Sequence, residues 1–262
     1  VEYSVDGGTT WTGSFSAVEG GNTVLVRQTD VAGNVSASTS YSFTLDTTAP
    51  AGPSVSLASD TGTSTADGVT RVGTVNVRGF EGGSTWEYSA NNGVSWTSGS
   101  GSSFTVTGDG LKSVLVRQTD VAGNVSASTS YSFTLDTTAP TTTVSTVAFS
   151  NDTGTSATDY ITNVASQTIS GTLSANVASG EVVKVSLDNG ATWKTAEMGE
   201  NNTFSLSGVS LAGSNTLKVQ VENRAGNPGP VLSQDYILDT SAPTVTVSNL
   251  SFSNDSGEES TF

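Results

Sequence analysis

The sequence predicts an all-β protein built from several domains in tandem, and three observations carry this prediction. First, apolar and polar residues alternate over short runs, as at Leu217, Val219 and Val221, and this is the period of a β-strand. Second, Gly, Ser, Thr and Asn are abundant, while no segment of ten or more residues has helical periodicity. Third, one block of sequence recurs after about a domain length.

The internal repeat is the strongest of these features. Residues 24–50 and 114–140 are identical over all 27 positions and begin 90 residues apart. A diverged third copy ends at Asp239, which lies 103 residues after Asp136. Such a period is too long for ankyrin, leucine-rich or propeller repeats and matches an immunoglobulin-type domain of roughly 100 residues. We therefore expect tandem immunoglobulin-like β-sandwich domains of about seven strands each, in an extended array.

Prolines set the expected domain boundaries. Each Asp-Thr-Thr-Ala or Asp-Thr-Ser-Ala run ends at a proline, which cannot donate a ladder hydrogen bond and stiffens the connection. We expect residues 1–46 to be the C-terminal part of one domain, 50–136 and 140–239 to be complete domains, and 243–262 to start a further domain. The linkers between them have three residues, so neighbouring domains must nearly touch.

Period-2 alternation places the strands within these domains. In the 140–239 domain, the run 182–187 leads into an Asp188-Asn-Gly turn, which is a strong hairpin signal. We expect seven strands in this domain, at residues 142–149, 167–173, 182–188, 192–197, 203–209, 216–222 and 231–238.

Charge and composition exclude several classes of function. The chain has 24 acidic and 9 basic residues, a net charge of −15, which repels nucleic acid and anionic membranes and attracts cations. No stretch is apolar enough to span a bilayer, so we expect no membrane insertion. Cysteine and histidine are absent, which excludes Ser-His-Asp and Cys-His sites and the usual zinc sites. We therefore expect a protein that is not an enzyme, with no catalytic residues.

Tryptophan follows the same turn in each repeat, at Trp11, Trp96 and Trp193. Aromatic rings of this kind can form platforms for sugars. However, recurrence at one fixed place in every repeat favours packing over the sandwich, because tryptophan is usually buried. We expect these rings to be mostly buried.

Acidic segments also recur in register and begin at Asp60, Asp152 and Asp255. A strand of nine residues spans about 30 Å, so a loop after the first strand would lie where the last strand leaves the domain. With this placement, we expect Asp60 to lie close to Asp67 and Asp136. In the next domain, we expect Asp152 to lie close to Asn151, Asp159 and Asp239. The Ala-Gly-Asn loop of the next domain, preceded by Asp120 or Asn223, should face each group across the linker.

Carboxylates held close together repel one another unless a cation joins them. Ca²⁺ accepts six to eight oxygen ligands, which Asp, Asn and backbone carbonyls can supply. The repeated acidic segments therefore predict structural Ca²⁺ at the domain junctions, although neither an EF-hand nor a Gly-rich calcium repeat is present. The alternative is that these residues only form Asx turns or solubilise loops. The candidate ligands are Asp46, Asp60, Asp67, Asp120, Asp136, Asn151, Asp152, Asp159, Asn223, Asp239 and Asp255.

Together these motifs resemble the bacterial Ig-like repeats of giant type I-secreted adhesins of Gram-negative bacteria. The matching segments are 150–159, 185–193, 224–227 and 239–243, and the resemblance covers the complete and partial domains. It implies extenders that hold a binding tip away from the cell, stiffened by calcium, with Asp152, Asp159, Asp239 and their counterparts as ligands. The 50–136 domain departs from the pattern, since it is 13 residues shorter and has Ser59 in place of Asn151. The calcium shell that the resemblance implies therefore follows the family pattern more closely in the 140–239 domain than in the 50–136 domain.

We therefore expect a calcium-stiffened spacer of an adhesin at a bacterial cell surface, outside the cell. Its partners would be the neighbouring repeats of the same chain, and contact with a host surface or polysaccharide would lie outside this segment. Two alternatives stay open. The domains could grip polysaccharide directly through exposed aromatics, or they could form an accessory array of a secreted hydrolase, S-layer or phage fibre.

Overall fold

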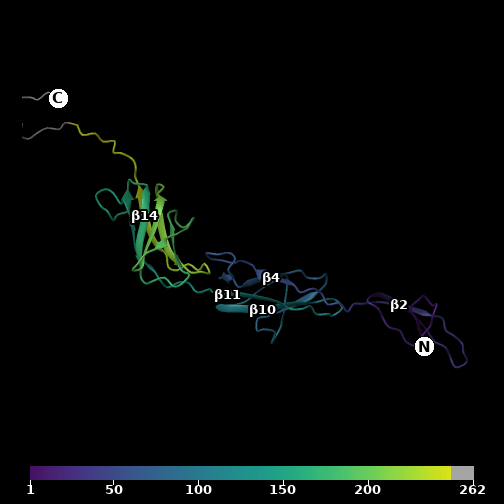
Figure 1. Cartoon of the computed structure of the whole chain (residues 1–262). Coiled ribbons are helices and arrows are strands. Elements are labelled where there is room, and N and C mark those ends of the chain that lie inside the picture. Colours follow the sequence, from purple (N-terminus) through teal and green to yellow (C-terminus); the bar gives the residue numbers. More distant parts are fainter. Residues whose placement is uncertain (249–262) are drawn as a thin grey trace, which may run out of the picture. The chain divides into compact units, whose positions relative to one another are not determined.

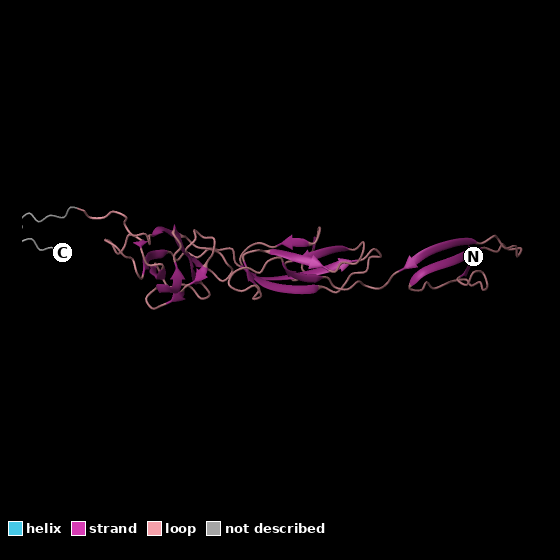
Figure 2. Ribbon diagram, turned by 90° about the horizontal axis from the view of Figure 1, so that it is seen from above, coloured by secondary structure: helices cyan, strands magenta, loops and turns pink. Residues whose placement is uncertain are grey.

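The computed structural model describes residues 1–248, and all their regular elements are β-strands (Figure 2). This confirms the all-β prediction. Since these residues form no helix, they contain no helical membrane span. The chain divides into two compact units. Unit 1 is Val1–Pro140 together with the loop Glu222–Pro228, and unit 2 is Thr141–Val221 with the residues from Gly229 onward.

Unit 1 begins with a three-stranded antiparallel sheet. Its order is β1 (Glu2–Ser4), β2 (Gly20–Arg27) and β3 (Thr39–Leu45). Residues 1–46 contain no further strand, so they form no second sheet to cover this one. One consequence is that Tyr41 on β3 is 63% exposed.

The rest of unit 1 is a sandwich of two sheets (Figure 1). One sheet contains, in spatial order, β4 (Ser54–Leu57), β6 (Thr74–Arg78) and β9 (Ser103–Thr105). The other contains, in spatial order, β5 (Val69–Thr70), β11 (Thr129–Leu135), β10 (Gly110–Thr119), β7 (Thr85–Ser89) and β8 (Thr97–Ser98). Both sheets supply the core, including Val75, Val77, Trp86, Val116 and Phe133.

Unit 2 is a second sandwich with the same plan (Figure 1). Its first sheet contains, in spatial order, β12 (Val144–Phe149), β14 (Ser166–Leu173), β18 (Thr203–Ser210) and β17 (Glu197–Met198). Its second sheet contains, in spatial order, β13 (Ile161–Thr162), β20 (Leu232–Leu238), β19 (Ser214–Glu222), β15 (Val182–Ser186) and β16 (Lys194–Thr195). The core includes Ile169, Val183, Phe204, Leu217 and Tyr236.

The strands predicted in unit 2 are present, with two refinements. The predicted strand 192–197 is two short strands, β16 and β17, which belong to different sheets. The chain therefore crosses between the sheets at Ala196. Strand β13 was not predicted, because two residues are too few for alternation to be visible in the sequence.

Two short parallel pairings position the acidic loops. Strand β5 pairs with the end of β11, with Thr70 beside Leu135, and β13 pairs with the end of β20, with Thr162 beside Leu238. The next residue in each last strand continues the ladder. Asp136 N donates to Thr70 O and Asp239 N donates to Thr162 O, each at 2.9 Å. Both acidic loops therefore lie beside the exit of the last strand, as the sequence predicts.

Candidate functional site: the acidic loops and strand exits

The acidic loop of unit 1, residues 59–70, is closed by its own side chains. Asp60 Oδ2 accepts a hydrogen bond from Gly68 N at 2.9 Å, and Asp67 Oδ1 accepts one from Val69 N at 3.0 Å. Thr70 Oγ1 donates to Ser59 O at 2.8 Å. The other oxygen of Asp60, Oδ1, is buried and has no hydrogen-bond partner.

The acidic loop of unit 2, residues 151–162, repeats these bonds. Asp152 Oδ2 accepts from Tyr160 N at 2.9 Å, and Asp159 Oδ1 accepts from Ile161 N at 3.1 Å. Thr162 Oγ1 donates to Asn151 O at 2.7 Å. Asp152 Oδ1 is buried without a partner, like its counterpart Asp60 Oδ1. The same orphan oxygen therefore occurs in two independent copies of the loop.

A buried carboxylate oxygen without a donor is unfavourable, so it marks a place where a cation or an ordered water fits. The sequence-predicted carboxylates do not form a cluster there. No group of three or more acidic side chains that could hold a metal occurs within residues 1–248. A Ca²⁺ ion at Asp60 or Asp152 would thus draw most of its ligands from backbone carbonyls, hydroxyls and water, which its chemistry allows.

The two loops have different residue types at one position where the backbone is left-handed in both. Gly68 and Tyr160 occupy equivalent places, and both have positive φ, at 69° and 63°. A left-handed conformation costs a non-glycine residue about 1–2 kcal/mol. Tyr160 offsets this cost by tertiary contacts, since its ring packs edge-on against Phe149 with centroids 5.3 Å apart. Its hydroxyl also donates to Val147 O.

The first strand exit and linker are held by two acidic residues. Asp46 Oδ1 accepts from Thr48 N at 3.0 Å, and Asp46 O accepts from Asn124 Nδ2 at 3.0 Å. Glu19 binds the linker, accepting from Thr47 N at 3.1 Å and from Thr47 Oγ1 at 2.7 Å. Glu19 was not singled out by sequence reasoning.

The exit after β11 follows the same plan. Asp136 Oδ1 accepts from Thr138 N at 3.0 Å, and Asp109 accepts from Thr137 N at 2.9 Å and from both threonine hydroxyls. The hydrogen bonds from Thr138 and Thr137 lower the pKa of Asp109 below its ordinary value. Asp109, like Glu19, immediately precedes the strand that enters the repeated block. That shared position was the signal by which both residues could have been found.

The Ala-Gly-Asn loops are closed from within. Asp120 is buried, and its two carboxylate oxygens accept from Asn124 N and Asn124 Nδ2, each at 2.8 Å. Burial raises the pKa of Asp120, but these hydrogen bonds outweigh it and leave the pKa below its ordinary value. Asn223 takes the place of Asp120 in the other loop and accepts from Asn227 N at 2.8 Å. The neutral Asn223 keeps a donor, Nδ2, which Asp120 lacks.

The side-chain amide of Asn223 donates hydrogen bonds to other residues of unit 1. Asn223 Nδ2 donates to Asp136 Oδ2 and to Thr138 O, each at 2.9 Å, and Asn227 Nδ2 donates to Asp136 O at 2.7 Å. The structure therefore brings together Asp136 and Asn223 from the predicted set. It likewise brings Asp46 close to Asn124, whose amide also binds Asp120.

The loop Glu222–Pro228 also contacts the acidic loop of unit 1. Arg224 Nε lies 2.8 Å from Asp67 Oδ2, and its guanidinium lowers the pKa of Asp67 below the ordinary value. Thr61 Oγ1 donates to Ala225 O. Gly62 has a φ of +99°, and a Cβ there would lie 2.0 Å from Arg224 O. Asp67, predicted as a calcium ligand, is thus already engaged in an ion pair.

The remaining predicted ligands are less constrained. Asp239 is exposed and accepts from Ser241 N at 2.9 Å. Asn151 N donates to Gln167 Oε1 at 2.9 Å, which fixes the start of the unit 2 loop. Asp255 lies outside the described residues.

The repeated tryptophans Trp11, Trp96 and Trp193 are not fully enclosed, but most of each residue is covered, which confirms the prediction that they are mostly buried. An arginine covers one face of two of the rings. The Arg27 and Arg117 guanidiniums each lie 3.9 Å from a ring centroid, over Trp11 and Trp96 respectively. The buried tryptophan is Trp86, whose indole N–H donates to Gly101 O at 3.0 Å. Sequence reasoning did not single it out, although Trp86 also follows a Gly-Gly turn, at Gly82 and Gly83.

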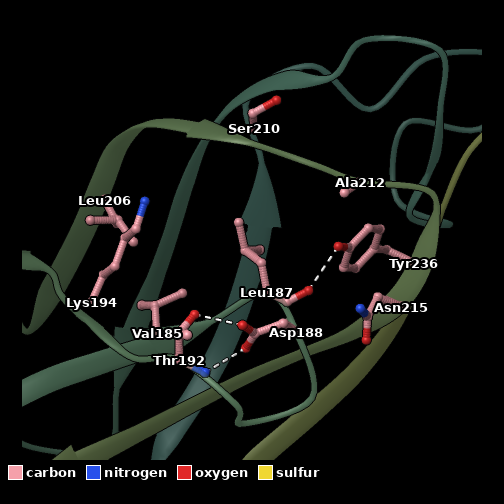
Figure 3. A pocket seen from close by; sticks show the side chains of 10 residues that line it. All are labelled: Val185, Leu187, Asp188, Thr192, Lys194, Leu206, Ser210, Ala212, Asn215 and Tyr236. Atoms are coloured by element: carbon pink, nitrogen blue, oxygen red, sulfur yellow. Dashed lines mark hydrogen bonds between the residues drawn. The ribbon is translucent and has the colours of Figure 1, made fainter.

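Unit 2 also contains a pocket of about 200 Å³ between its strands (Figure 3). Its walls include Val185, Leu206 and Tyr236, and its polar groups are largely engaged. Asp188 accepts from Thr192 and Ser186, hydrogen bonds that lower its pKa to about 2, and the Tyr236 hydroxyl donates to Leu187 O at 2.8 Å. The pocket is smaller than ordinary small-molecule sites of about 300–1,000 Å³.

Three solved structures are similar to this chain at low identity. The chicken CNTN1 FN1-FN3 domains are 11% identical, with a TM-score of 0.44 and 90% of each chain covered. The Clostridium thermocellum CbhA fibronectin(III)-like modules are 11% identical, with a TM-score of 0.42, covering 71% of this chain and 94% of theirs. A 1.5-MDa bacterial ice-binding adhesin is 23% identical, with a TM-score of 0.29, covering 83% of this chain and 73% of that one.

The sequence comparisons identify the family. A search of curated proteins finds no match. The family model of the bacterial Ig-like domain matches residues 48–137 and again residues 138–240, most of the chain. Immunoglobulin-like and fibronectin-like domain families are generally non-catalytic. The chain belongs to the bacterial Ig-like domain family.

Proposed function

We propose that this chain is a non-catalytic spacer in a large adhesin of a bacterial surface, where tandem domains hold a binding region away from the cell. The observation that carries the proposal is how the linkers are held. Glu19 binds Thr47 and Thr48, and Asp109 binds Thr137 and Thr138, through backbone and hydroxyl donors. A linker fixed at consecutive residues transmits the orientation of its domain, which is what a stiff spacer needs.

The segments 1–46, 50–136, 140–239 and 243–262 are the repeating parts of this proposed spacer. Their partners are the neighbouring repeats of the same chain. The setting outside the cell is supported by the bacterial Ig-like family and by the adhesin-like motifs of the sequence. Contact with a host surface or a polysaccharide is assigned to parts of the protein beyond this chain.

Structural Ca²⁺ is the second part of the proposal. The supporting observation is the buried, unpartnered oxygen of Asp60 and of Asp152, which occurs at equivalent places in two loops. Bound there, the ion would neutralise buried negative charge and cross-link loop carbonyls. Asp60 and Asp152 would hold it, while Asp136 and Asp239 lie on the strand ends that pair with the same loops.

One observation favours a second candidate function, polysaccharide binding. Trp11, Trp96 and Trp193 are mostly buried but not fully enclosed, so a part of each residue stays open to solvent. Against this, Arg27 and Arg117 already cover one face of Trp11 and Trp96, which leaves less ring area for a sugar. Saturable, glycan-specific quenching of tryptophan fluorescence would favour this candidate over the spacer.

Small-angle X-ray scattering of the full chain tests the spacer directly. We expect a rod-like profile in millimolar Ca²⁺ and a more flexible profile after chelation with EGTA. Replacing Asp109 with Ala should add flexibility at one linker, because Thr137 and Thr138 lose their acceptor. Asp235→Ala, an exposed acidic residue away from the linkers, is the matched control. A compact profile in Ca²⁺ would contradict the proposal.

A further inference from the structure

The sequence contains two Asn-Gly dipeptides, and both occupy the same turn in different sandwiches. Asn92-Gly93 lies between β7 and β8 of unit 1, and Asn189-Gly190 lies between β15 and β16 of unit 2. Both asparagines are left-handed, with φ of 57° and 60°, and the glycines that follow have φ of 85° and 92°. Asparagine and glycine suit this turn because they tolerate positive φ better than other residues do.

The pair of asparagine and glycine also carries a chemical weakness, spontaneous deamidation. In this reaction the backbone nitrogen of the glycine loses its proton and attacks the side-chain amide carbon of the asparagine. A C–N bond forms, and the side-chain nitrogen takes up a proton and leaves as ammonia. Water then opens the succinimide ring to give aspartate or isoaspartate, and either product adds a negative charge. Glycine permits the attack because it has no side chain to shield its nitrogen.

In both turns the nitrogen that would attack is bonded to a buried serine. Gly93 N donates to Ser89 Oγ and Gly190 N donates to Ser186 Oγ, each at 2.8 Å. Both serines are 1% exposed. The glycine nitrogen must therefore give up a buried hydrogen bond before it can lose its proton and turn toward the asparagine side chain, and giving up such a bond is costly.

The serine hydroxyls are themselves held in place. Ser89 Oγ donates to Asn91 Oδ1 at 2.8 Å, and Ser186 Oγ donates to Asp188 Oδ1 at 2.7 Å. A hydroxyl has one proton, so donating it to the side chain leaves the oxygen to accept from the glycine N–H. Thr192 donates to Asp188 through both its amide and its hydroxyl and closes the other side of the unit 2 turn (Figure 3).

A third copy of this turn has the same serine but no asparagine. Ser4 Oγ accepts from Gly8 N at 2.8 Å and donates to Asp6 Oδ1 at 2.7 Å. The residue at the place of the two asparagines is Gly7, with φ of 73°. The bond from glycine to serine therefore belongs to the turn itself, and glycine fits where the asparagines stand.

We propose that Asn92 and Asn189 are latent deamidation sites, which the hydroxyls of Ser89 and Ser186 hold unreactive while the turns are closed. In the closed turn, the glycine nitrogen is bonded to serine and cannot reach the asparagine side chain. When the turn opens, that hydrogen bond breaks and the asparagine reacts as it does in an unfolded chain. Deamidation at each site therefore records how often its turn opens.

Peptide mapping by mass spectrometry, after incubation of the full chain in mildly alkaline buffer, measures deamidation at each site. In the folded wild type, both sites should react at least about tenfold more slowly than in the chain unfolded by urea. Ser186→Ala should speed the reaction at Asn189 by at least about fivefold, the rate equivalent of one ordinary hydrogen bond, and leave Asn92 unchanged. Ser89→Ala should do the converse, so each site is the internal reference for the other.

Two further variants are matched controls within the unit 2 turn. Thr192→Ala removes a hydroxyl donor to Asp188 but leaves the bond from Gly190 to Ser186, so the rate at Asn189 should stay close to that of the wild type. Asn189→Gly should fold normally and give no product at this turn. Circular dichroism of each variant shows whether its sandwiches remain folded.

Equal rates in the folded and the urea-unfolded wild type would overturn the proposal. So would equal acceleration by Ser186→Ala and Thr192→Ala, because general loosening of the turn would then explain the change. If Ser186→Ala unfolds unit 2, the Ser89→Ala variant in unit 1 and the comparison of folded with unfolded wild type still decide. None of these results bears on the spacer proposal, which depends on the linkers and not on the turns.

Discussion

The two acidic loops, residues 59–70 and 151–162, share a motif but lie in different surroundings. In both, the leading aspartate caps a backbone amide eight residues on, and its other oxygen is buried without a partner. In unit 1 the loop contacts Arg224 and Ala225, and Gly62 has no room for a side chain. In unit 2, Asp159 is exposed, and a Cβ added at Gly154 would meet no atom within 4 Å.

This difference separates what the motif determines from what its neighbours determine. The Asp-Thr-Gly-Thr-Ser segment sets the loop conformation and leaves the orphan oxygen in both copies. The surroundings determine the other properties of each loop. At Gly62 a side chain is excluded both by the positive φ and by the neighbouring Arg224, whereas at Gly154 only the positive φ opposes one. The surroundings also decide whether the left-handed position is filled by Gly68 or by a strained tyrosine packed on Phe149.

The largest expected effect comes from removing the Tyr160 side chain. Tyr160→Ala keeps the left-handed strain and loses the ring packing and the hydroxyl hydrogen bond, so the free energy of unfolding of unit 2 should fall by about 3 kcal/mol. Tyr160→Gly loses the same contacts but relieves the strain, and should be more stable than the alanine variant by about 1 kcal/mol. Hydrogen exchange of the backbone amides of β14 and β18 measures the free energy of unfolding of unit 2 in each variant. Equal stabilities would mean that Tyr160 is not strained.

A smaller effect is expected at the paired glycines. Gly154→Ala should cost about 1 kcal/mol, from positive φ alone. Gly62→Ala should cost about 2 kcal/mol, because the new Cβ also displaces Arg224 O and with it the hydrogen bond from Thr61 to Ala225. Hydrogen exchange at β6 and β14 reports the two units separately. If the two substitutions cost the same, the contact at Gly62 contributes nothing to stability.

Much of this fold could be predicted because its strands are defined locally. The alternation at Leu217, Val219 and Val221 places β19, and the length of the first strand predicts that the acidic loop reaches the last-strand exit. The identical hairpins β2–β3 and β10–β11 keep the same register, with Val24 opposite Tyr41 and Val114 opposite Tyr131. Local sequence therefore determines the pairing even where burial differs.

The features that were not predicted depend on contacts distant in sequence. Trp86 is buried because Phe80 and Phe104 meet it across the sandwich, and no local pattern distinguishes it from Trp96. Glu19 and Asp109 act on threonines 28 and 29 residues away, a relation that exists only once the strands are paired. The number of acidic residues also led us to predict closer clusters of carboxylates than the structure contains. Asp67 is instead paired with Arg224, and Asp120 accepts hydrogen bonds from Asn124 in its own loop.

Thermal unfolding of the full chain as a function of Ca²⁺ concentration tests the account most directly. Extracellular calcium modules bind with dissociation constants of about 10⁻⁴–10⁻³ M, and at ten times that value one site stabilises the fold by about 1.4 kcal/mol. Wild type and the control Asp235→Asn should both melt at higher temperature in calcium. Asp60→Asn should remove the part of the shift that belongs to unit 1, and Asp152→Asn the part that belongs to unit 2. If calcium leaves the wild-type melting temperature unchanged, or shifts all variants equally, the orphan oxygens of Asp60 and Asp152 do not mark calcium sites.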